Sequence, residues 1–363
     1  IIAIGVVTVC CTAIRKHKFA AEVGLGHVLS KLLQQELLKV GHYIPGAVLR
    51  DEKDLVQKAK LRASSEFILY ELPADGDWFL LKQSAAQMLP LQPGSVLTLT
   101  TKIKAKSDTS ITIELWCSSK KFNHTPDVIL ERKKFVLKAG INDITVSFEK
   151  TMESQGYGFV CFMKNESIYL QKSKLRVTGI LSVFNKTNVE VSNYGRQEPP
   201  ANIGIDTFEF WCPGRRPGGE NIAMKIEGGI ICFGVENIRN GVNRPVSQPN
   251  AWVASPADPD PIITVTWDQK QKIKRIELTF DTDFDHPMET VLMNHPEAIM
   301  PFCIQDFVIC DDKKQRLYEK SGNYQSRYNI TFDSSIITQV IHIHLKANSR
   351  NVPSSLFEVR CYE

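Results

Sequence analysis

Apolar and polar residues alternate with a period of two through most of residues 48–186. The clearest alternating runs are 96–103, 110–116, 144–148 and 175–180. Because successive side chains of a strand point to opposite faces of a sheet, such runs predict strands with one buried and one solvated face. Short strands at this interval, separated by turn residues, predict a first antiparallel, jelly-roll-like β-sandwich over residues 48–186.

A second set of strand patterns comes after a stretch rich in glycine and proline. Residues 187–222 lack periodicity and contain the glycine-rich run 212–219, so we expect a linker there. That run lacks the Gly-Lys-Ser/Thr ending of a phosphate-binding loop, and no strand-then-helix pattern surrounds it, which favours a plain loop. Residues 223–363 are predicted to form a second sandwich. Its expected strands are 264–267, 273–280, 307–309, 340–345 and 356–362.

Residues 1–47 are the one segment with a helical pattern. Apolar residues recur at spacings of three and four between Leu29 and Val40, and Gly41 comes just after the last apolar turn, which predicts a helix that ends there. The apolar run 1–14 is shorter than the roughly 20 residues of a membrane-spanning helix, and its basic residues come after it, unlike those of a signal peptide. We therefore expect the chain to begin inside a buried helix of a longer protein and to have no membrane partner. The compartment, cytoplasmic or secreted, stays open.

Charge and cysteine usage exclude several classes of function. The 44 basic and 40 acidic residues give a net charge of only +4, and no basic stripe is interleaved with aromatic residues, so no nucleic-acid partner is expected. The nine cysteines contain no Cys-x-x-Cys pair, which argues against a zinc site or a thioredoxin-type redox site. Cys161 and Cys232 lie inside apolar strand patterns, where we expect buried thiols.

Three carboxylates at alternating positions resemble the start of a calcium loop. Asp281, Asp283 and Asp285 have the right spacing, but an EF-hand would need glycine and glutamate where this chain has His286 and Leu292. A calcium site of another kind stays open. The alternative is a polar strand end whose carboxylates cap backbone N–H groups.

Two histidines share one face of a predicted strand. His342 and His344 are two residues apart, so they point the same way and would need a third ligand to hold a metal. The sequence does not identify that ligand, and solvent-facing histidines are the alternative. Neither a Gly-x-Ser-x-Gly elbow nor a His-Glu-x-x-His helix occurs, so local motifs define no enzyme class.

The segment 237–253 has the composition of a recognition loop. It displays asparagine and arginine, with Asn243 and Arg244 at its centre, and it ends at Trp252. Loops at the end of a rigid sandwich are common ligand-binding surfaces. We therefore name Asn243, Arg244 and Trp252, with Asp281, Asp283 and Asp285, as candidate ligand-binding residues. For Trp252 we favour the alternative that it anchors the core.

The segment 237–280 resembles galactose-binding-like, discoidin-type sandwiches. The resemblance rests on the turn Asn240-Gly241, the spacing from Trp252 to Ser255, and the strand patterns 262–267 and 273–280. It implies that residues 223–363 form a galactose-binding-like domain, in which Asn243, Arg244 and the acidic run would hydrogen-bond sugar hydroxyls.

A wider resemblance covers nearly the whole chain. The patterns Asn-x-x-Asn-Gly-x-x-Arg-Pro from Asn237 and Phe-Asp-Thr-Asp-Phe from Phe280, with the helical start and 357–360, resemble the C-terminal half of bacterial FAD-dependent oxidoreductases, many of them labelled xanthan-lyase-like. The resemblance implies that 1–47 is a remnant of a flavin domain. The Gly-x-Gly-x-x-Gly fingerprint that would hold FAD is absent from this sequence, so no cofactor is expected in this chain.

Three functions are compatible with this sequence. The preferred one is a non-catalytic accessory half of a flavin oxidoreductase-like protein that binds carbohydrate through its last sandwich. The second is an interaction module that packs on a flavin domain or partner subunit. The third is a polysaccharide-active enzyme, for which a cleft with convergent charged groups would be required.

Overall fold

The computed structural model describes residues 53–119, 126–150, 152–187, 209–213, 221–231, 233–282 and 300–363. The chain divides into two compact units, Ile1–Ala47 and Val48–Glu363. The predicted helical segment 1–47 lies outside the described residues, all of which belong to the second unit. No helix in the described ranges is long and apolar enough to span a membrane.

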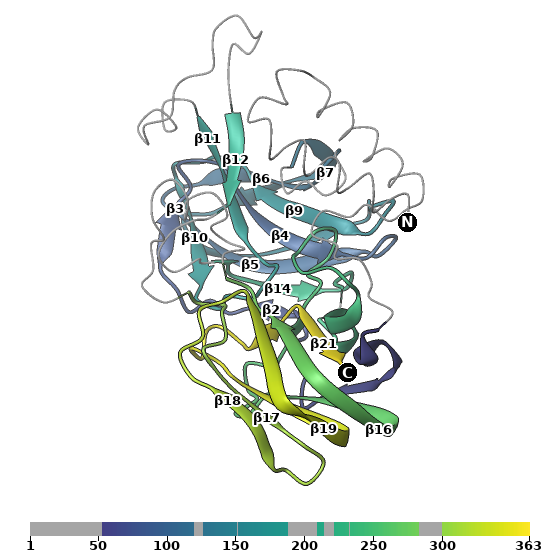
Figure 1. Ribbon diagram of the computed structural model, residues 1–363. Coiled ribbons are helices and arrows are strands. Elements are labelled where there is room, and N and C mark those ends of the chain that lie inside the picture. The colour runs from purple at the N-terminus through teal and green to yellow at the C-terminus, as the bar shows by residue number, and fades with distance from the viewer. Residues whose placement is uncertain are drawn as a thin grey trace, which may run out of the picture. The chain divides into compact units, whose positions relative to one another are not determined.

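The first sandwich consists of two antiparallel sheets (Figure 1). In the described part of the chain, one sheet has seven strands: β2 (Glu71–Leu72), β3 (Trp78–Leu80), β5 (Leu97–Ala105), β8 (Gly140–Phe148), β10 (Ile168–Ser173), β13 (Asn221–Ile222) and β14 (Met224–Glu227). The other has six: β4 (Ala85–Leu91), β6 (Thr109–Cys117), β7 (Val128–Leu137), β9 (Gly156–Phe162), β11 (Ser182–Thr187) and β12 (Glu209–Pro213). Buried residues of both sheets form one core.

The second sandwich is built around one long pair of antiparallel strands. A six-stranded sheet contains β1 (Lys60–Ala63), β16 (Ile262–Thr279), β17 (Asp306–Cys310), β18 (Arg316–Lys320), β19 (Arg327–Lys346) and β21 (Glu358–Tyr362). A ribbon of β15 (Trp252–Val253) and β20 (Ser355–Leu356) and the 3-10 helices η1 (Leu55–Lys58) and η3 (Val235–Arg239) complete it. The pairing of β16 with β19 shifts register twice, and buried residues on both sides of these shifts belong to one core.

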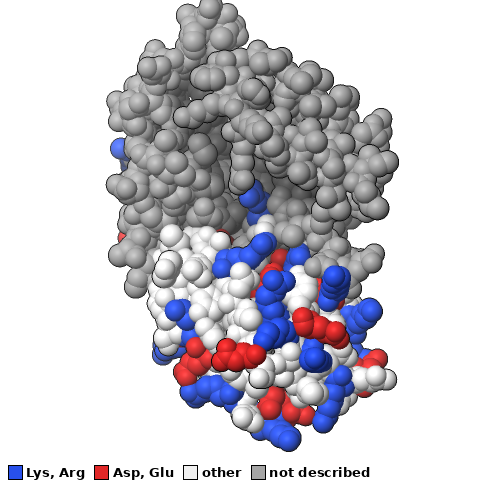
Figure 2. Space-filling model, in the orientation of Figure 1, with Lys and Arg blue, Asp and Glu red and all other residues white. Residues whose placement is uncertain are grey.

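Burial follows the alternation that the sequence displays. In β5, Leu97, Leu99 and Ile103 are buried, whereas Lys102 and Lys104 on the opposite face are exposed. The prediction of a mainly β, antiparallel fold is therefore confirmed. On the face of the second sandwich seen in Figure 2, basic and acidic side chains interleave and do not gather into a patch of one sign.

One predicted strand is wrong. Residues 175–180 are buried but form no strand, although their pattern alternates. Gly179 has φ +84°, a conformation that side-chain-bearing residues rarely adopt, and the Ile180 N–H donates to Val177 O within a turn (2.9 Å). The segment is therefore a buried turn, and its Arg176 N–H donates to the distant Asn351 O (2.7 Å) without forming a strand ladder.

The two sandwiches exchange segments. β1 precedes the whole first sandwich in the sequence, yet it pairs with β16 of the second, with Lys60 opposite Thr266. Conversely, β14 comes after the predicted linker, yet it pairs with β5 of the first, with Lys225 opposite Thr100. The predicted domain limits of 48–186, 187–222 and 223–363 stay a prediction, but strand pairing crosses them in both directions.

A buried amide holds the returning segment in the first sandwich. Gln87 on β4 is fully buried; its side-chain NH2 donates to Leu181 O (3.0 Å) and Asn221 Oδ1 (3.1 Å), and its oxygen accepts from Ile222 N (2.8 Å). Asn221 in turn donates to Leu175 O (2.8 Å). These bonds satisfy backbone groups that would otherwise be buried without partners.

We expect Gln87→Ala to lower the free energy of unfolding by about 3 kcal/mol, because it leaves several buried polar groups unpaired. Urea denaturation measures this loss. Gln92→Ala is the matched control, since Gln92 is exposed, and it should change stability by less than about 0.5 kcal/mol. Equal effects of the two variants would contradict the role assigned to Gln87.

Candidate functional site

The predicted recognition loop is braced by its own asparagines. Asn237 donates to Ala251 O (2.9 Å), which closes the loop at its base. Asn240 donates to Asn250 Oδ1 (3.0 Å), and Asn250 donates to Arg244 O (3.0 Å). Asn250 itself has φ +54°, a region that asparagine tolerates better than most residues. Most amides of this loop therefore fix its shape.

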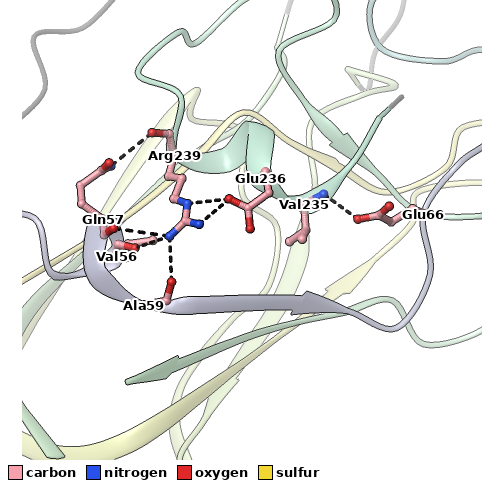
Figure 3. A network of polar contacts seen from close by, with 7 residues as sticks. All are labelled: Val56, Gln57, Ala59, Glu66, Val235, Glu236 and Arg239. Carbon is pink, nitrogen blue, oxygen red and sulfur yellow. Dashed lines mark hydrogen bonds and ion pairs between the residues drawn. The ribbon is translucent and has the colours of Figure 1, made fainter. Parts of the chain in front are cut away.

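Arg239 is part of a polar network that joins η3 to the start of β1 (Figure 3). Its guanidinium donates to the carbonyl oxygens of Ala59 (2.7 Å), Val56 (3.4 Å) and Gln57 (3.4 Å), and it forms an ion pair with Glu236. Three carbonyls and one carboxylate match the donors of a planar guanidinium. Arg239 is thus a structural residue.

Asn243 and Arg244 are displayed by this braced loop. Arg244 is exposed and Asn243 is half-buried. The Arg244 guanidinium makes no hydrogen bond or ion pair within the described part of the chain, and only its backbone oxygen is used, by Asn250. The two residues are available to a ligand, and their role in binding stays a prediction.

Trp252 does not belong to a binding surface. Its side chain is fully buried, and its indole N–H donates to Ser65 O (3.0 Å). This corrects its place among the candidate ligand-binding residues and agrees with the alternative that it anchors the core. When a tryptophan follows a polar loop, no sequence pattern shows whether it anchors the core or binds a ligand.

Of the three aspartates in the acidic run, only Asp281 belongs to the described residues. Asp281 is 2% exposed and accepts a hydrogen bond from the Thr178 hydroxyl (3.1 Å), which in turn lies 2.9 Å from the Ser355 hydroxyl. The carboxylate is therefore buried and hydrogen-bonded in the interior, and its role in ligand binding stays a prediction. Asp283 and Asp285 lie outside the described residues, so the calcium site stays a prediction.

The two histidines of β19 share one face, as predicted, but have separate partners. His342 Nδ1 lies 3.0 Å from the Thr264 hydroxyl, and His344 Nδ1 lies 3.2 Å from Asp260 Oδ1. The described residues contain no group of three or more His, Cys, Asp or Glu side chains that could hold a metal ion. Each imidazole is oriented by an oxygen of a different element.

A groove on the outer face of the second sandwich is the site that sequence reasoning missed. We call it the β17 groove. It has a volume of about 700 Å³, within the usual range of ligand sites, and it runs along β17 between β18 and β19. Its polar lining residues are Asp260, Asp306, Lys314, Arg316, Glu319, Lys320, Ser321, His344 and Lys346.

Basic and acidic side chains lie beside one another along the β17 groove. His344 meets Asp260 (3.2 Å), Lys346 meets Asp306 (3.7 Å), and Arg316 meets Glu319. Asp306 also accepts from the Gly322 N–H (3.1 Å). These contacts place donors beside acceptors while leaving both in solvent, which suits recognition of a polar ligand.

One wall of the groove is held by Asp258. Its carboxylate accepts from the hydroxyls of Ser64 and Ser65 and from the Asp260 N–H (3.1 Å). Burial acts to raise the pKa of Asp258, but these hydrogen bonds outweigh it and lower the pKa below its usual value of 3.8. The loop that presents Asp260 to His344 is thereby tied to the end of β1.

The alternation of apolar and polar residues predicted part of the groove. The alternation in 306–310 and 340–345 places Asp306, Val308, His342 and His344 on outward faces. Which of these side chains lie next to each other depends on the register of β17 with β19. In that register, Val308 lies opposite His344 and Asp306 lies opposite Lys346. Periodicity gives the face of each residue but not its cross-strand partner.

The expectation of a buried thiol is confirmed for Cys161, whereas Cys117 and Cys310 are partly exposed. Cys161, Cys303 and Cys361 are buried, and burial raises the pKa of each thiol, that of Cys303 to about 12. Cys232 lies outside the described residues. Such thiols are poor nucleophiles at neutral pH.

Comparison with known proteins gives solved structures only. No family model and no curated protein matches the sequence. A family 32 carbohydrate-binding module from Streptococcus pneumoniae EndoD is 17% identical, with a TM-score of 0.28, over 36% of this chain and 86% of that chain. The family 32 module from C. perfringens NanJ in complex with galactose is 16% identical, with a TM-score of 0.25, over 35% and 82%.

A chitosan-binding module of a Paenibacillus sp. IK-5 chitosanase/glucanase is similar at 14% identity, with a TM-score of 0.27, over 36% of this chain and 86% of that one. These identities and TM-scores are too low to assign the chain to a family. The resemblance to flavin oxidoreductases likewise stays a prediction.

We expect Arg239→Ala to lower the free energy of unfolding by about 2 kcal/mol, because it removes charge-assisted hydrogen bonds to three carbonyls. Arg316→Ala removes an exposed ion pair of the same i,i+3 spacing and should cost less than about 1 kcal/mol. Urea denaturation of both variants tests the difference. Equal losses would show that the network of Figure 3 adds nothing beyond a surface pair.

Stability should fall as the pH decreases through the titration of His342. Burial, then His344 and Lys314, lower the pKa of His342 below 6.5, while Asp311 acts in the opposite direction. The unfolded chain therefore binds this proton more readily, so the stabilisation is present above about pH 6.5 and declines as the pH falls toward the folded pKa. Urea midpoints between pH 7 and pH 5 should decline less in His342→Gln. An unchanged slope would contradict this.

Proposed function

We propose that the second sandwich binds carbohydrate through the β17 groove. The observation that carries this proposal is the mixed set of donors and acceptors along the groove, from carboxylates, an imidazole, a guanidinium and amines. Sugar hydroxyls both donate and accept, so a site for them needs acceptors and donors side by side. The groove offers both within one concave surface.

The charged groups of the groove can serve a ligand that carries no strong charge of its own. Arg316, Lys346 and His344 each have an acidic partner, whereas Lys314 and Lys320 form no ion pair within the described part of the chain. Three carboxylates lie among these basic groups on one surface, so the lining offers acceptors as well as donors. A neutral, hydroxyl-rich ligand uses both.

The braced loop with Asn243 and Arg244 is a second surface of the same proposed kind. Its amide and guanidinium groups are planar donors on a backbone that Asn237, Asn240 and Asn250 hold in place. A loop whose backbone is already held in place loses less conformational entropy on binding than a mobile loop does. The role of an accessory half that recognises carbohydrate and acts beside a flavin domain is part of this proposal.

We expect Asp260→Ala and His344→Ala to weaken glycan binding by about tenfold each, because each removes one half of an oriented donor–acceptor pair. A glycan array identifies the ligand with the full chain, and calorimetry with that ligand gives the affinities. Asp333→Ala is the matched control, since this aspartate lies on β19 outside the groove residues. Unchanged affinity in both groove variants would refute the groove as the site.

The variant Arg244→Ala distinguishes glycan binding by the loop from glycan binding by the groove. If the loop binds, this variant lowers the affinity by about tenfold, and Arg350→Ala, an equally exposed arginine in a turn, leaves it unchanged. If the groove alone binds, Arg244→Ala behaves like its control. A chain that folds and binds no glycan would remove the proposed function altogether.

A further inference from the structure

The first sandwich has a notch in the outer face of its seven-stranded sheet. β10 pairs with β5 as far as Leu170 opposite Ile103, and β14 pairs with β5 from Thr100 onward. Between these two pairings the chain steps from β13 to β14 at Ala223, whose carbonyl accepts from the Thr101 hydroxyl (2.8 Å). The step leaves a cavity of about 260 Å³ between the ends of β10 and β14.

The rim of the notch carries charges of both signs without ion pairs. Lys102 lies opposite Asp143 in the pairing of β5 with β8, and Lys225 lies opposite Glu71 in the pairing of β14 with β2. None of these four side chains forms a hydrogen bond or ion pair within the described part of the chain, and all four line the notch. Their hydrogen-bonding capacity is available to a ligand.

Gln171 is held in one orientation at the same rim. Its NH2 group donates to Ala74 O (3.0 Å) and Gly76 O (3.2 Å), which leaves its carbonyl oxygen as an acceptor. The loop that supplies these carbonyls is itself fixed, because Gly76 N donates to Lys172 O (3.0 Å) and Lys172 N to Asp77 O (3.0 Å). This acceptor is therefore set in position before any ligand arrives.

An aromatic side chain lies beside Gln171. Trp78 on β3 is directly opposite Gln171 on β10, and residues opposite each other in an antiparallel pair share a face. Trp78 is only half-buried, and its indole N–H makes no hydrogen bond within the residues that the structure describes. The next outward pair is Leu80 with Tyr169, so apolar surface continues along β3.

We infer that this notch is a second carbohydrate-binding site, on the first sandwich and independent of the β17 groove. An aromatic face packs against the C–H groups of a sugar ring, while an oriented amide oxygen, two ammonium groups and two carboxylates meet its hydroxyls. Equal numbers of basic and acidic groups disfavour an ion of either sign as the ligand. The volume of about 260 Å³ lies just below the usual range of ligand sites, so we assign to the notch one sugar ring of a longer chain.

The test uses the full chain with cellotetraose, chitotetraose and galactotetraose as probes, followed by tryptophan fluorescence and calorimetry. One probe should bind the wild type at millimolar concentration or below. Trp78→Ala and Lys102→Ala should each weaken that binding by about tenfold, because Lys102 lines the notch and Trp78 lies beside Gln171 at its edge. Lys134→Ala on β7 is the control for an exposed lysine, and Tyr324→Ala for an exposed aromatic residue.

Three results would overturn the second site. The first is that no probe binds, and the second is that binding is equal in Lys102→Ala and Lys134→Ala. The third is that binding is lost in Asp260→Ala and kept in Lys102→Ala. That result assigns the binding to the β17 groove and supports the proposed function instead. Lys102 is exposed, so its variant keeps the test valid if Trp78→Ala unfolds. Loss in the notch variants with full binding in Asp260→Ala establishes the second site.

Discussion

The segment 54–65 is bound into the second sandwich by side chains that are far away in the sequence, and this attachment determines much of the structure. The indole N–H groups of Trp252 and Trp267 donate to Ser65 O (3.0 Å) and Leu55 O (2.8 Å). Arg239 donates to Ala59 O (2.7 Å), and Asp54 accepts from Cys361 N (3.0 Å). Backbone groups of an edge segment need such partners when they are buried. The start and the end of the described chain are thereby joined in one sandwich.

Both proposed surfaces depend on this exchange of segments. Because β1 lies in the second sandwich, Ser64 and Ser65 reach Asp258 and position the loop that carries Asp260 into the β17 groove. Because β14 returns to the first sandwich, the sheet steps from β13 to β14 and leaves the notch beside Gln171. At the notch, Gln171 is held by hydrogen bonds to Ala74 O and Gly76 O, whereas the charged side chains of the rim have no partner within the described residues. The groups that are held in place reduce the entropy lost when a weak, hydroxyl-rich ligand binds.

The sequence predicted the individual strands better than their partners. Alternation located β5, β6, β17 and β19, because a half-buried strand needs an apolar residue at every second position. It failed at 175–180, where the apolar residues are buried in a turn around Gly179, and it could not show that β1 and β14 exchange sandwiches. Of the candidate site residues, Trp252 and Asp281 lie in the interior, whereas the groove and the notch arise from cross-strand register. Register depends on contacts over long sequence separations, which local patterns do not contain.

In the function proposed for this chain, a rigid scaffold recognises sugars by oriented polar groups. The central residue is His344, whose imidazole faces Asp260 across the β17 groove (3.2 Å). The most direct measurement is the NMR signal of the His344 imidazole during titration with the glycan that the full chain binds. We predict a saturable shift of this signal at the concentrations that give the calorimetric affinity, and none in the signal of His342, which is held by Thr264. Saturable glycan binding without any change at His344 would contradict the assignment of the β17 groove as the binding site.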